Sequence, residues 1–532
     1  MTRSPGALAA LLLAGLLPAG MALAAPWEGV VFEDRDGDGR QAAGEPGIAG
    51  VLVSDGRRLA LTDGAGRYRL EAAGGAPVFV VKPAGWAVGT RADGLPAFWH
   101  APPGDGPARG DFPLRPAAPA EDPLRVLVVS DPQVKSTADV DYYARDVVDP
   151  LAPAGDGARL GLVLGDVVDD AVDLYPGVTA VTTRVGVPWL HAPGNHDLDP
   201  GADADAGSLG AFRAAYGPDT HAWEEPEASF VVLDDVVVLP GGDYVGGFRE
   251  DQFAFLEALL PRLRRDRLLV VAVHIPLFDT AGPGRAPTFR AEDRERLFAL
   301  LQPFPDVLVL SGHRHAIRQY RHGPADGWHG ARPLHESNVG AASGAFWSGA
   351  PDAEGIPDAT MADGSPNGHA LLEVGADGAY RLSWHPARLP AGDPARTPAL
   401  HLHAPRVLRQ GAYPAWGVYA NVYMGEADTR VEFRVDGGEW APMRRVEAPD
   451  PRLSAENARD DAAPALRGYD RSPEAQPSPH LWRGALPTAL GVGEHRVEVR
   501  AFDRWHGEQR ASTRYRLEAW GGAPAPGTAP GG

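Results

Sequence analysis

The middle of this 532-residue chain contains the stretch Leu160-Gly-Leu-Val-Leu-Gly-Asp-Val-Val-Asp-Asp170, which indicates how this part of the chain folds. Its apolar run, Leu160–Leu164, ends at Gly165 and leads at once into a cluster of carboxylates. A run that is apolar on both faces is typical of a buried strand in a layered α/β core. Glycine beside the polar residues allows the backbone to approach a ligand closely. The stretch therefore predicts a buried strand that ends in a polar site.

Four more polar clusters end strand-like runs in the same part of the chain. They are Ser130-Asp131-Pro132-Gln133, Gly194-Asn195-His196-Asp197, Val273-His274 and Gly312-His313-Arg314-His315. Helical patterns such as Phe253/Leu256/Leu259/Leu263 lie between the runs. Because open α/β folds place their sites at the carboxyl ends of strands, we expect the polar loops to converge. Carboxylate, amide and imidazole groups suit hard or borderline divalent ions, and two neighbouring ions need a bridging carboxylate.

Each cluster alone has a simpler explanation. Gly194–Asp197 can be a turn in which Asn and Asp bond their own backbone, and His313 and His315 can lie on alternate faces of a strand end. The ordered set D-x-Q, G-D-x-x-D, G-N-H-D, H and G-H-x-H is much harder to obtain by chance. The complete set therefore favours one shared site over five independent turns.

The ordered set resembles the calcineurin-like metallophosphoesterases, whose pattern is D-x-H, G-D-x-x-D, G-N-H-[DE], H and G-H-x-H. The likeness covers residues 124–390. Asn338–Trp347 and Met361–Gly368 further resemble a bacterial exported subgroup with a β domain on each side. The resemblance implies an α/β (α+β) four-layer core, a double β-sandwich flanked by helices, with β-sandwich domains on both sides.

The resemblance also implies a centre that holds two divalent metal ions, from among Mn, Fe, Zn and Mg. One ion would take Asp131, Gln133, Asp166 and His315, and the other Asp166, Asn195, His274 and His313. Asp166 would bridge the ions, and a hydroxide held between them would attack phosphorus in line.

Two further residues would act on the leaving group in such a centre. His196 would face the leaving-group oxygen as an acid, and Asp169 would hold the orientation of its ring. Asp170 and Asp197 are expected only to cap turns or to support the ligands. The implied function is exported, metal-dependent hydrolysis of a phosphomonoester or a phosphodiester.

Gln133 is the departure from the family pattern, which has histidine at this position. An amide is a poorer ligand than imidazole for most transition metals. We therefore expect the first ion to bind more weakly, to be of a harder type or to be exchangeable. The purple acid phosphatase branch is disfavoured, because it would have a tyrosine where Asp169 stands. Gln133 is also the only support for an alternative function, a surface-binding or scaffold protein with β modules and a catalytically weakened phosphoesterase-like domain.

Length, charge and cysteine content restrict the partners and the metal ligands. The chain is long enough for about three domains. Its formal net charge of −20, without a basic patch, argues against nucleic acid as a partner. Because it has no cysteine, disulfides and thiolate ligands are excluded. We expect a small phosphorylated substrate and no stable membrane insertion.

Changes in composition and hydrophobic pattern along the chain predict six segments. They are a signal peptide at 1–24, a β-sandwich domain at 25–114, a Pro/Ala linker at 115–123, the phosphoesterase domain at 124–395, a second β-sandwich at 396–520 and a disordered tail at 521–532. The signal peptide rests on Arg3, the apolar run from Leu8 to Leu23 and an A-x-A pattern before Ala25. A membrane anchor is the alternative for this segment. We therefore expect a periplasmic or secreted protein.

A second metal motif lies in the predicted N-terminal domain. Asp34, Asp36, Asp38 and Glu45 match the calcium-loop pattern D-x-[DN]-x-[DN]-G-x5-E. Because the flanks look like strands, the segment resembles the calcium-binding β modules of bacterial surface proteins rather than a helix pair. A structural calcium ion would rigidify this domain. The alternative is an acidic turn without an ion.

Other polar and aromatic residues receive weaker assignments. His401 and His403 alternate on a predicted strand and are expected at the surface. His335-Glu336 and Phe346-Trp347 follow the last metal motif closely enough to line the cleft. For the two aromatic residues, packing in the core is an equal alternative.

Overall fold

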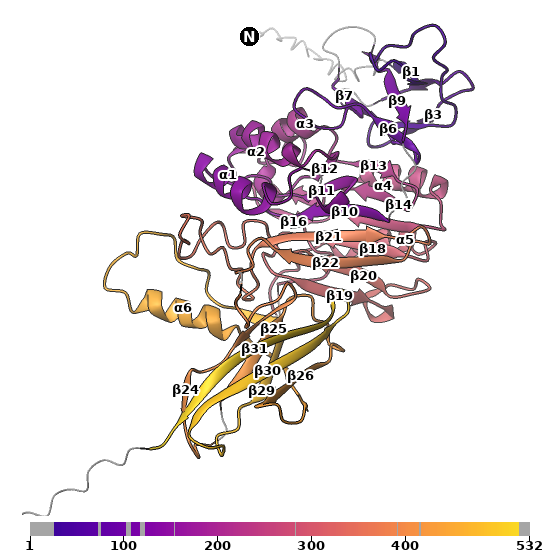
Figure 1. The fold of residues 1–532 in the computed structure, drawn as a ribbon. Helices are drawn as coiled ribbons and strands as arrows, with labels where there is room; N and C mark the ends of the chain where they lie inside the picture. Colours follow the sequence, from indigo (N-terminus) through magenta and orange to yellow (C-terminus); the bar gives the residue numbers. More distant parts are fainter. Residues whose placement is uncertain are drawn as a thin grey trace, which may run out of the picture.

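The computed structural model describes residues 26–72, 76–102, 108–117, 123–153, 155–281, 284–390, 392–413 and 416–520. The predicted signal peptide at 1–24 and the predicted tail at 521–532 lie outside the described residues. Figure 1 shows a layered core between an N-terminal and a C-terminal β-sandwich.

Two mixed sheets form the core, in the orders β12-β11-β10-β21-β22 and β13-β14-β17-β18-β20-β19. Their strands are β10 (Leu124–Val129), β11 (Leu160–Leu164), β12 (Trp189–Ala192), β13 (His221–Glu224), β14 (Ala228–Val232), β17 (Leu268–Ala272), β18 (Val307–Ser311), β19 (Arg318–His322), β20 (Leu334–Asn338), β21 (Gly368–Val374) and β22 (Tyr380–Pro386). The strands β10, β11 and β12 are parallel to one another, as are β14, β17, β18 and β20. The carboxyl ends of these parallel strands can therefore supply one shared site.

Helices cover the outer face of each sheet. They are α1 (Thr137–Tyr143), α2 (Tyr175–Thr182), α3 (Gly210–Tyr216), α4 (Glu250–Leu259) and α5 (Ala291–Leu301). On β10, Leu127 and Val129 pack in the cluster that includes α1, α2 and α3. Val126 and Val128 point the other way, into the cluster shared with the second sheet, α4 and α5. Both faces of β10 are buried, and the predicted four-layer fold class is confirmed (Figure 1).

The N-terminal sandwich has one sheet in the order β4-β1-β9-β6, with β8 beside β1, and another in the order β3-β2-β5-β7. Its strands are β1 (Trp27–Glu33), β2 (Leu52–Ser54), β3 (Leu59–Leu61), β4 (Arg67–Leu70), β5 (Val78–Val80), β6 (Trp86–Val88), β7 (Trp99–His100), β8 (Ala108–Arg109) and β9 (Phe112–Pro116). Because Arg115 and Pro116 pair with β6, β9 takes in the first two residues of the predicted linker.

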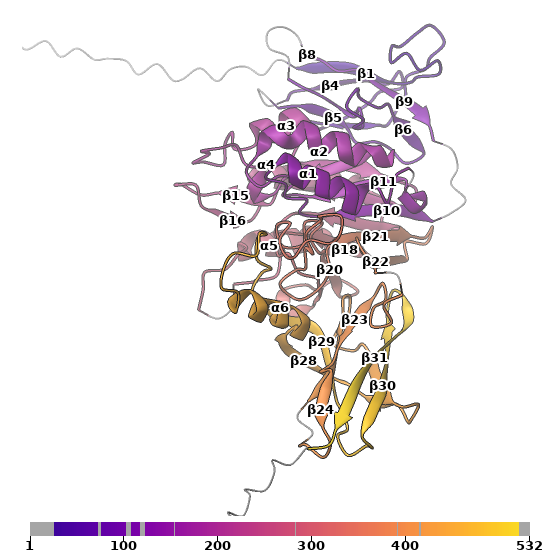
Figure 2. The same ribbon diagram turned by 60° about the vertical axis from the view of Figure 1, so that its left-hand side comes forward.

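The C-terminal sandwich has sheets in the orders β23-β25-β29-β28 and β24-β31-β30-β26-β27. Its strands are β23 (Leu400–His403), β24 (Val407–Arg409), β25 (Gly417–Val422), β26 (Val431–Val435), β27 (Ala441–Pro442), β28 (Arg444–Pro449), β29 (Pro477–Ala485), β30 (Gly493–Asp503) and β31 (Gly507–Glu518). An unpredicted helix, α6 (Pro451–Asp461), begins where the Asp450 side chain accepts from the N–H groups of Arg452 and Leu453. Figure 2 shows α6 between this sandwich and the core.

His401 is buried, so the expectation of a surface position is wrong for this residue. The residue is 2% exposed, and its Nε2 lies 3.0 Å from Oδ2 of Asp450. The core and α6 cover this face of β23, which a strand of an isolated sandwich would expose to water. None of the described helices combines the length and apolar character needed to cross a bilayer.

Candidate metal centre

The seven predicted metal ligands lie in loops that follow core strands. Asp131 comes two residues after β10, Asp166 two after β11, and His274 two after β17. Asn195 begins the short helix η5 (Asn195–Asp197) after β12, and His313 and His315 follow β18. Parallel packing of these strands brings the five loops to one edge of the core, as the sequence pattern predicts.

Most of these ligands have a strained backbone. The residues with positive φ include Asp131 (50°), Gln133 (42°), Asp166 (49°), His313 (72°) and His315 (45°). Residues other than glycine avoid this region, at a cost of about 1–3 kcal/mol each. Strain concentrated in this way persists only where the surrounding structure enforces it, and it marks this edge of the core as a functional site.

The glycines of the motifs let the loops approach one another. A Cβ atom on Gly194 would lie 2.2 Å from Oδ1 of Asp166, and one on Gly312 would lie 1.9 Å from Oγ of Ser130. A Cβ on Gly165 would lie 2.6 Å from Nδ1 of His274. These glycines therefore allow contact between neighbouring ligand loops, in addition to any approach of a ligand.

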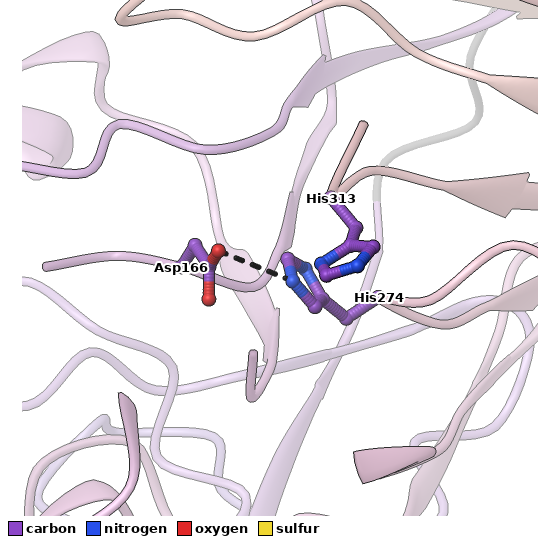
Figure 3. A group of neighbouring side chains, drawn as sticks. All are labelled: Asp166, His274 and His313. Atoms are coloured by element: carbon purple, nitrogen blue, oxygen red, sulfur yellow. Dashed lines mark ion pairs between the residues drawn. The ribbon is translucent and has the colours of Figure 1, made fainter. Parts of the chain in front are cut away.

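One ligand group surrounds His274, as Figure 3 shows. Donor atoms of Asp166, His274 and His313 lie within 4.8 Å of one another. Nδ1 of His274 lies 2.8 Å from the carbonyl oxygen of Leu164, to which it donates, while Nε2 lies 3.2 Å from Oδ2 of Asp166 and 3.2 Å from Oδ1 of Asn195. Burial lowers the pKa of His313 to about 3. His313 is therefore neutral, as an imidazole ligand must be.

The other ligand group surrounds Asp131. Nε2 of His315 lies 3.6 Å from Oδ1 of Asp131, and Nδ1 of His315 donates to the carbonyl oxygen of Gly344 at 2.5 Å. Gln133 is 2% exposed, and its Nε2 donates to Oδ1 of Asp169 at 3.4 Å. Its Oε1 is buried and has no hydrogen-bond partner among the described residues. A buried amide oxygen left without a donor fits a cation ligand, so the residues present suit a metal ion.

Asp166 lies between the two ligand groups. Its Oδ2 faces His274, and its Oδ1 accepts from the backbone N–H of His196 at 2.9 Å. Its carbonyl oxygen accepts from the backbone N–H of Gln133 at 2.9 Å. Asp166 therefore contacts the loops of both ligand groups, His274 through its carboxylate and Gln133 through its backbone.

His196 lies at the exposed rim of this group. Its Nδ1 is 3.0 Å from Oδ1 of Asp170 and 3.3 Å from Oδ1 of Asp169. Burial disfavours the charged ring, but the carboxylates of Asp166 and Asp170 outweigh it and raise the pKa of His196 above its ordinary value. The ring is thus oriented by two carboxylates, of which Asp170 is the nearer.

Two buried aspartates support the loops without facing a ligand group. Asp197 accepts from the backbone N–H groups of Gly194 and Val167 at 2.9 Å and 3.1 Å, which is the supporting role expected from the sequence. Asp235 accepts from the backbone N–H of His274 at 3.0 Å. No sequence motif indicated Asp235, because it lies 39 residues from His274.

Aromatic side chains lie on both histidines of G-H-x-H. The ring of Phe346 stacks on that of His315 with 4.5 Å between the ring centroids, and Phe346 is 45% exposed. Trp347 is buried, and its Nε1 donates to the carbonyl oxygen of Pro132. The ring of Tyr244 packs edge-on against that of His313, with 6.1 Å between the ring centroids. It belongs to a hairpin of β15 (Val236–Val238) and β16 (Tyr244–Gly246), and no sequence motif indicated it.

His335 and Glu336 lie inside β20 rather than at the cleft surface. His335 bonds with Tyr380 and Gln319, and Glu336 bonds with His322. Their expected place in the cleft lining is therefore wrong, because β20 is covered on both sides.

Three family models match consecutive parts of the chain. They are the N terminal of calcineurin-like phosphoesterase at residues 35–117, calcineurin-like phosphoesterase at 124–316 and the C terminal of calcineurin-like phosphoesterase at 336–509. The chain belongs to the calcineurin-like phosphoesterases. The resemblance stated from the motifs is confirmed, including the subgroup with additional domains on both sides. As a member of this family, the protein is a metal-dependent phosphoesterase.

Several solved structures are similar to this phosphoesterase. A purple acid phosphatase from yellow lupin (Lupinus luteus) seeds is 14% identical, with 63% of this chain and 66% of that chain covered and a TM-score of 0.38. GAP50, the anchor in the inner membrane complex of Plasmodium, is 12% identical over 50% of this chain and 86% of its own, with a TM-score of 0.32. TT1561 of Thermus thermophilus is 14% identical over 50% of this chain and 100% of its own, with a TM-score of 0.28. No curated protein matches the phosphoesterase.

Proposed function

We propose that this phosphoesterase is an exported enzyme that hydrolyses a small phosphomonoester or phosphodiester at a two-metal centre. The observation that carries the proposal is the contact of Asp166 with both ligand loops, because its carboxylate lies 3.2 Å from His274 and its carbonyl oxygen accepts from the backbone N–H of Gln133. Each group combines carboxylate, imidazole and amide donors. They come from Asp166, His274 and Asn195 in one group and from Asp131, His315 and Gln133 in the other.

Two divalent ions held by these residues would supply an activated water and neutralise charge on the phosphoryl oxygens. The chain's own residues then have separate tasks. His196 holds a proton at the rim and delivers it to the leaving-group oxygen. Asp169 and Asp170 fix the direction in which its ring points, since both contact Nδ1, and Nε2 is then the nitrogen that would face the substrate.

Gln133 shapes the metal preference of the centre. With an amide oxygen in place of an imidazole, the ligands on this side are Asp131, Gln133, Asp166 and His315. Oxygen-rich sets favour harder ions, so we propose that Mn²⁺ or Mg²⁺ serves better here than in a site with another histidine.

We also propose a structural calcium ion in the N-terminal sandwich. Carboxylate oxygens of Asp34, Asp36 and Glu45 lie within 4.8 Å of one another, and Asp38 is outside this group. Such an ion would hold the loop 34–45 in one conformation and would take no part in catalysis.

The decisive experiment compares hydrolysis of an aryl phosphomonoester and an aryl phosphodiester by the metal-free protein as Mn²⁺, Mg²⁺, Zn²⁺ or Fe²⁺ is added back. We expect turnover of at least one ester that depends on added metal. A folded protein that binds these ions and hydrolyses neither ester would contradict the proposed reaction. Export is tested separately, by finding the protein and its N-terminus after cell fractionation.

A further inference from the structure

A buried polar network joins the metal-binding loop 312–317 to the C-terminal sandwich. Its members are Asp363, His401, Asn421, Asp450 and His480, none of them more than 2% exposed. They come from the loop 361–365, from β23, β25 and β29, and from the start of α6. Buried charges persist only where they are paired, so this network fixes the relative positions of the elements that supply it.

Asp363 is the point where the network reaches the metal-binding loop. Its Oδ2 accepts from the backbone N–H of Ile317 at 2.8 Å, and its Oδ1 accepts from the backbone N–H of Ser365 at 2.8 Å. Ile317 lies two residues after His315 and immediately before β19. One carboxylate therefore anchors the carboxyl end of the loop that carries His313 and His315.

His480, on β29 of the C-terminal sandwich, holds that carboxylate. Its Nε2 lies 3.1 Å from Oδ2 of Asp363, and its Nδ1 lies 2.7 Å from Oδ1 of Asn421. The amide of Asn421 cannot be reversed, because its Nδ2 donates to the carbonyl oxygen of Asp363 and to Oδ2 of Asp450. The ring of His480 is therefore held between Asn421 and Asp363, and Oγ of Ser478 also lies 3.2 Å from its Nδ1.

Close backbone packing also surrounds the partner of His315 and the neighbour of Asp363. Nδ1 of His315 donates to the carbonyl oxygen of Gly344. A Cβ on Gly344 would lie 1.6 Å from the carbonyl oxygen of Ala359, and a Cβ on Gly364 would lie 2.4 Å from Cβ of Asp450. Neither glycine position therefore has room for a side chain, and the one at Gly364 is closed by Asp450 of the C-terminal domain.

We propose that the C-terminal sandwich is a working part of the metal centre, in which His480 and Asp363 are positioning residues for the loop that carries His313 and His315. The inference rests on the proposed two-metal function. Residues that orient metal ligands from outside the coordination sphere change metal affinity by about 10–100-fold. Because His313 and His315 belong to different ligand groups, displacement of their loop weakens both ions.

Mn²⁺ titration of the metal-free, full-length protein tests the proposal. We expect His480→Gln and Asp363→Asn each to weaken Mn²⁺ binding about 10-fold or more. At saturating Mn²⁺, each variant should reach the wild-type kcat, with an unchanged KM for the ester. Hydrogen exchange at the Ile317 amide should also be faster in both metal-free variants. Asp363→Asn keeps the side-chain size and decides the question if His480→Gln does not fold.

Glu426→Gln is the matched control. It removes the pair between Glu426 and Arg321, 2.8 Å apart, which also joins β19 to the C-terminal sandwich but does not touch the metal-binding loop. Wild-type Mn²⁺ affinity in this variant supports the proposal. Weakening equal to that of His480→Gln would overturn it, as would unchanged affinity in both network variants. Failure of the wild-type protein to bind Mn²⁺ would instead overturn the proposed function itself, and this inference with it.

Discussion

The backbone N–H of His196 donates to Oδ1 of Asp166 over 2.9 Å. This bond joins the residue proposed as the acid directly to the carboxylate proposed to bridge the two ions. Asp166 keeps its other oxygen toward His274, at 3.2 Å. Movement of Asp166 therefore changes the ligand geometry and the position of His196 together, which makes their separate roles testable by variants that alter only one of them.

Replacement of His196 by Ala should lower kcat by roughly 10²–10⁴-fold, because a positioned acid is lost. The content of bound metal should stay nearly unchanged, since the backbone bond to Asp166 does not need the imidazole. Metal analysis and steady-state kinetics of the same preparation check both expectations. Full activity in this variant would remove His196 from the mechanism.

Asp166→Asn should lose both ions, because a neutral amide cannot supply charge to two cations at once. Metal analysis after dialysis provides the measurement. Asp170→Asn is the matched control, since Asp170 is 77% exposed and lies in neither ligand group. Retention of two equivalents by Asp166→Asn would show that another residue bridges the ions.

Gln133→His should strengthen binding of the ion on the Asp131 side and shift the preference of that site toward Zn²⁺, because imidazole is the better donor for borderline metals. Gln133→Leu has a similar volume and should weaken the same ion. Competition between Mn²⁺ and Zn²⁺ in a calorimetric titration separates the three proteins. Identical stoichiometry and preference in all three would exclude Gln133 as a ligand and assign its buried Oε1 to a bound water or the substrate.

Calcium should raise the melting temperature of the full-length protein, because an ion that binds only the folded state stabilises it by about 2.7 kcal/mol at a concentration 100 times its Kd. Glu45→Gln should abolish the shift. Asp38→Asn should leave most of it, since Asp38 lies outside the group formed by Asp34, Asp36 and Glu45. A wild-type melting curve that is the same with calcium and with chelator would favour an acidic turn without an ion.

Acid should destabilise the protein partly through His221, which is 2% exposed. Burial lowers the pKa of His221 to about 4, from an ordinary value of 6.5. Below pH 6.5 the unfolded chain binds a proton that the folded protein does not, so stability falls as pH drops from 6.5 to 4. Between pH 7 and pH 4.5 this contribution is about 2 kcal/mol.

His221→Phe should reduce the loss of unfolding free energy between these two pH values by that amount. The environment suits a phenyl ring, because Nε2 of His221 is buried without a partner among the described residues and the ring lies 5.2 Å from that of Phe98. Denaturant unfolding at both pH values gives the comparison. An equal loss in wild type and variant would show that His221 is protonated in the folded protein.

Sequence alone was sufficient for the features that depend on short segments. Leu160–Leu164 is apolar on both faces and ends in glycine and carboxylate, and these local properties determine both a buried strand and the place where its loop becomes polar. The same pattern at five places was enough to assign the family and to nominate the ligands. The helical spacing of Phe253, Leu256 and Leu259 likewise follows from their local order, and all three are buried in α4.

Tertiary structure alone decided the features that depend on distant residues. Four features arise between segments that are far apart in the sequence. They are the burial of Oε1 of Gln133, the burial of His401, the support of His274 by Asp235 and the link between His480 and Asp363. His480 and Asp363 are 117 residues apart. A polar side chain looks the same in sequence whether it faces water, a metal ion or another buried polar group, and only the packing of the whole chain selects among these, because burial sets the cost of leaving it unpaired.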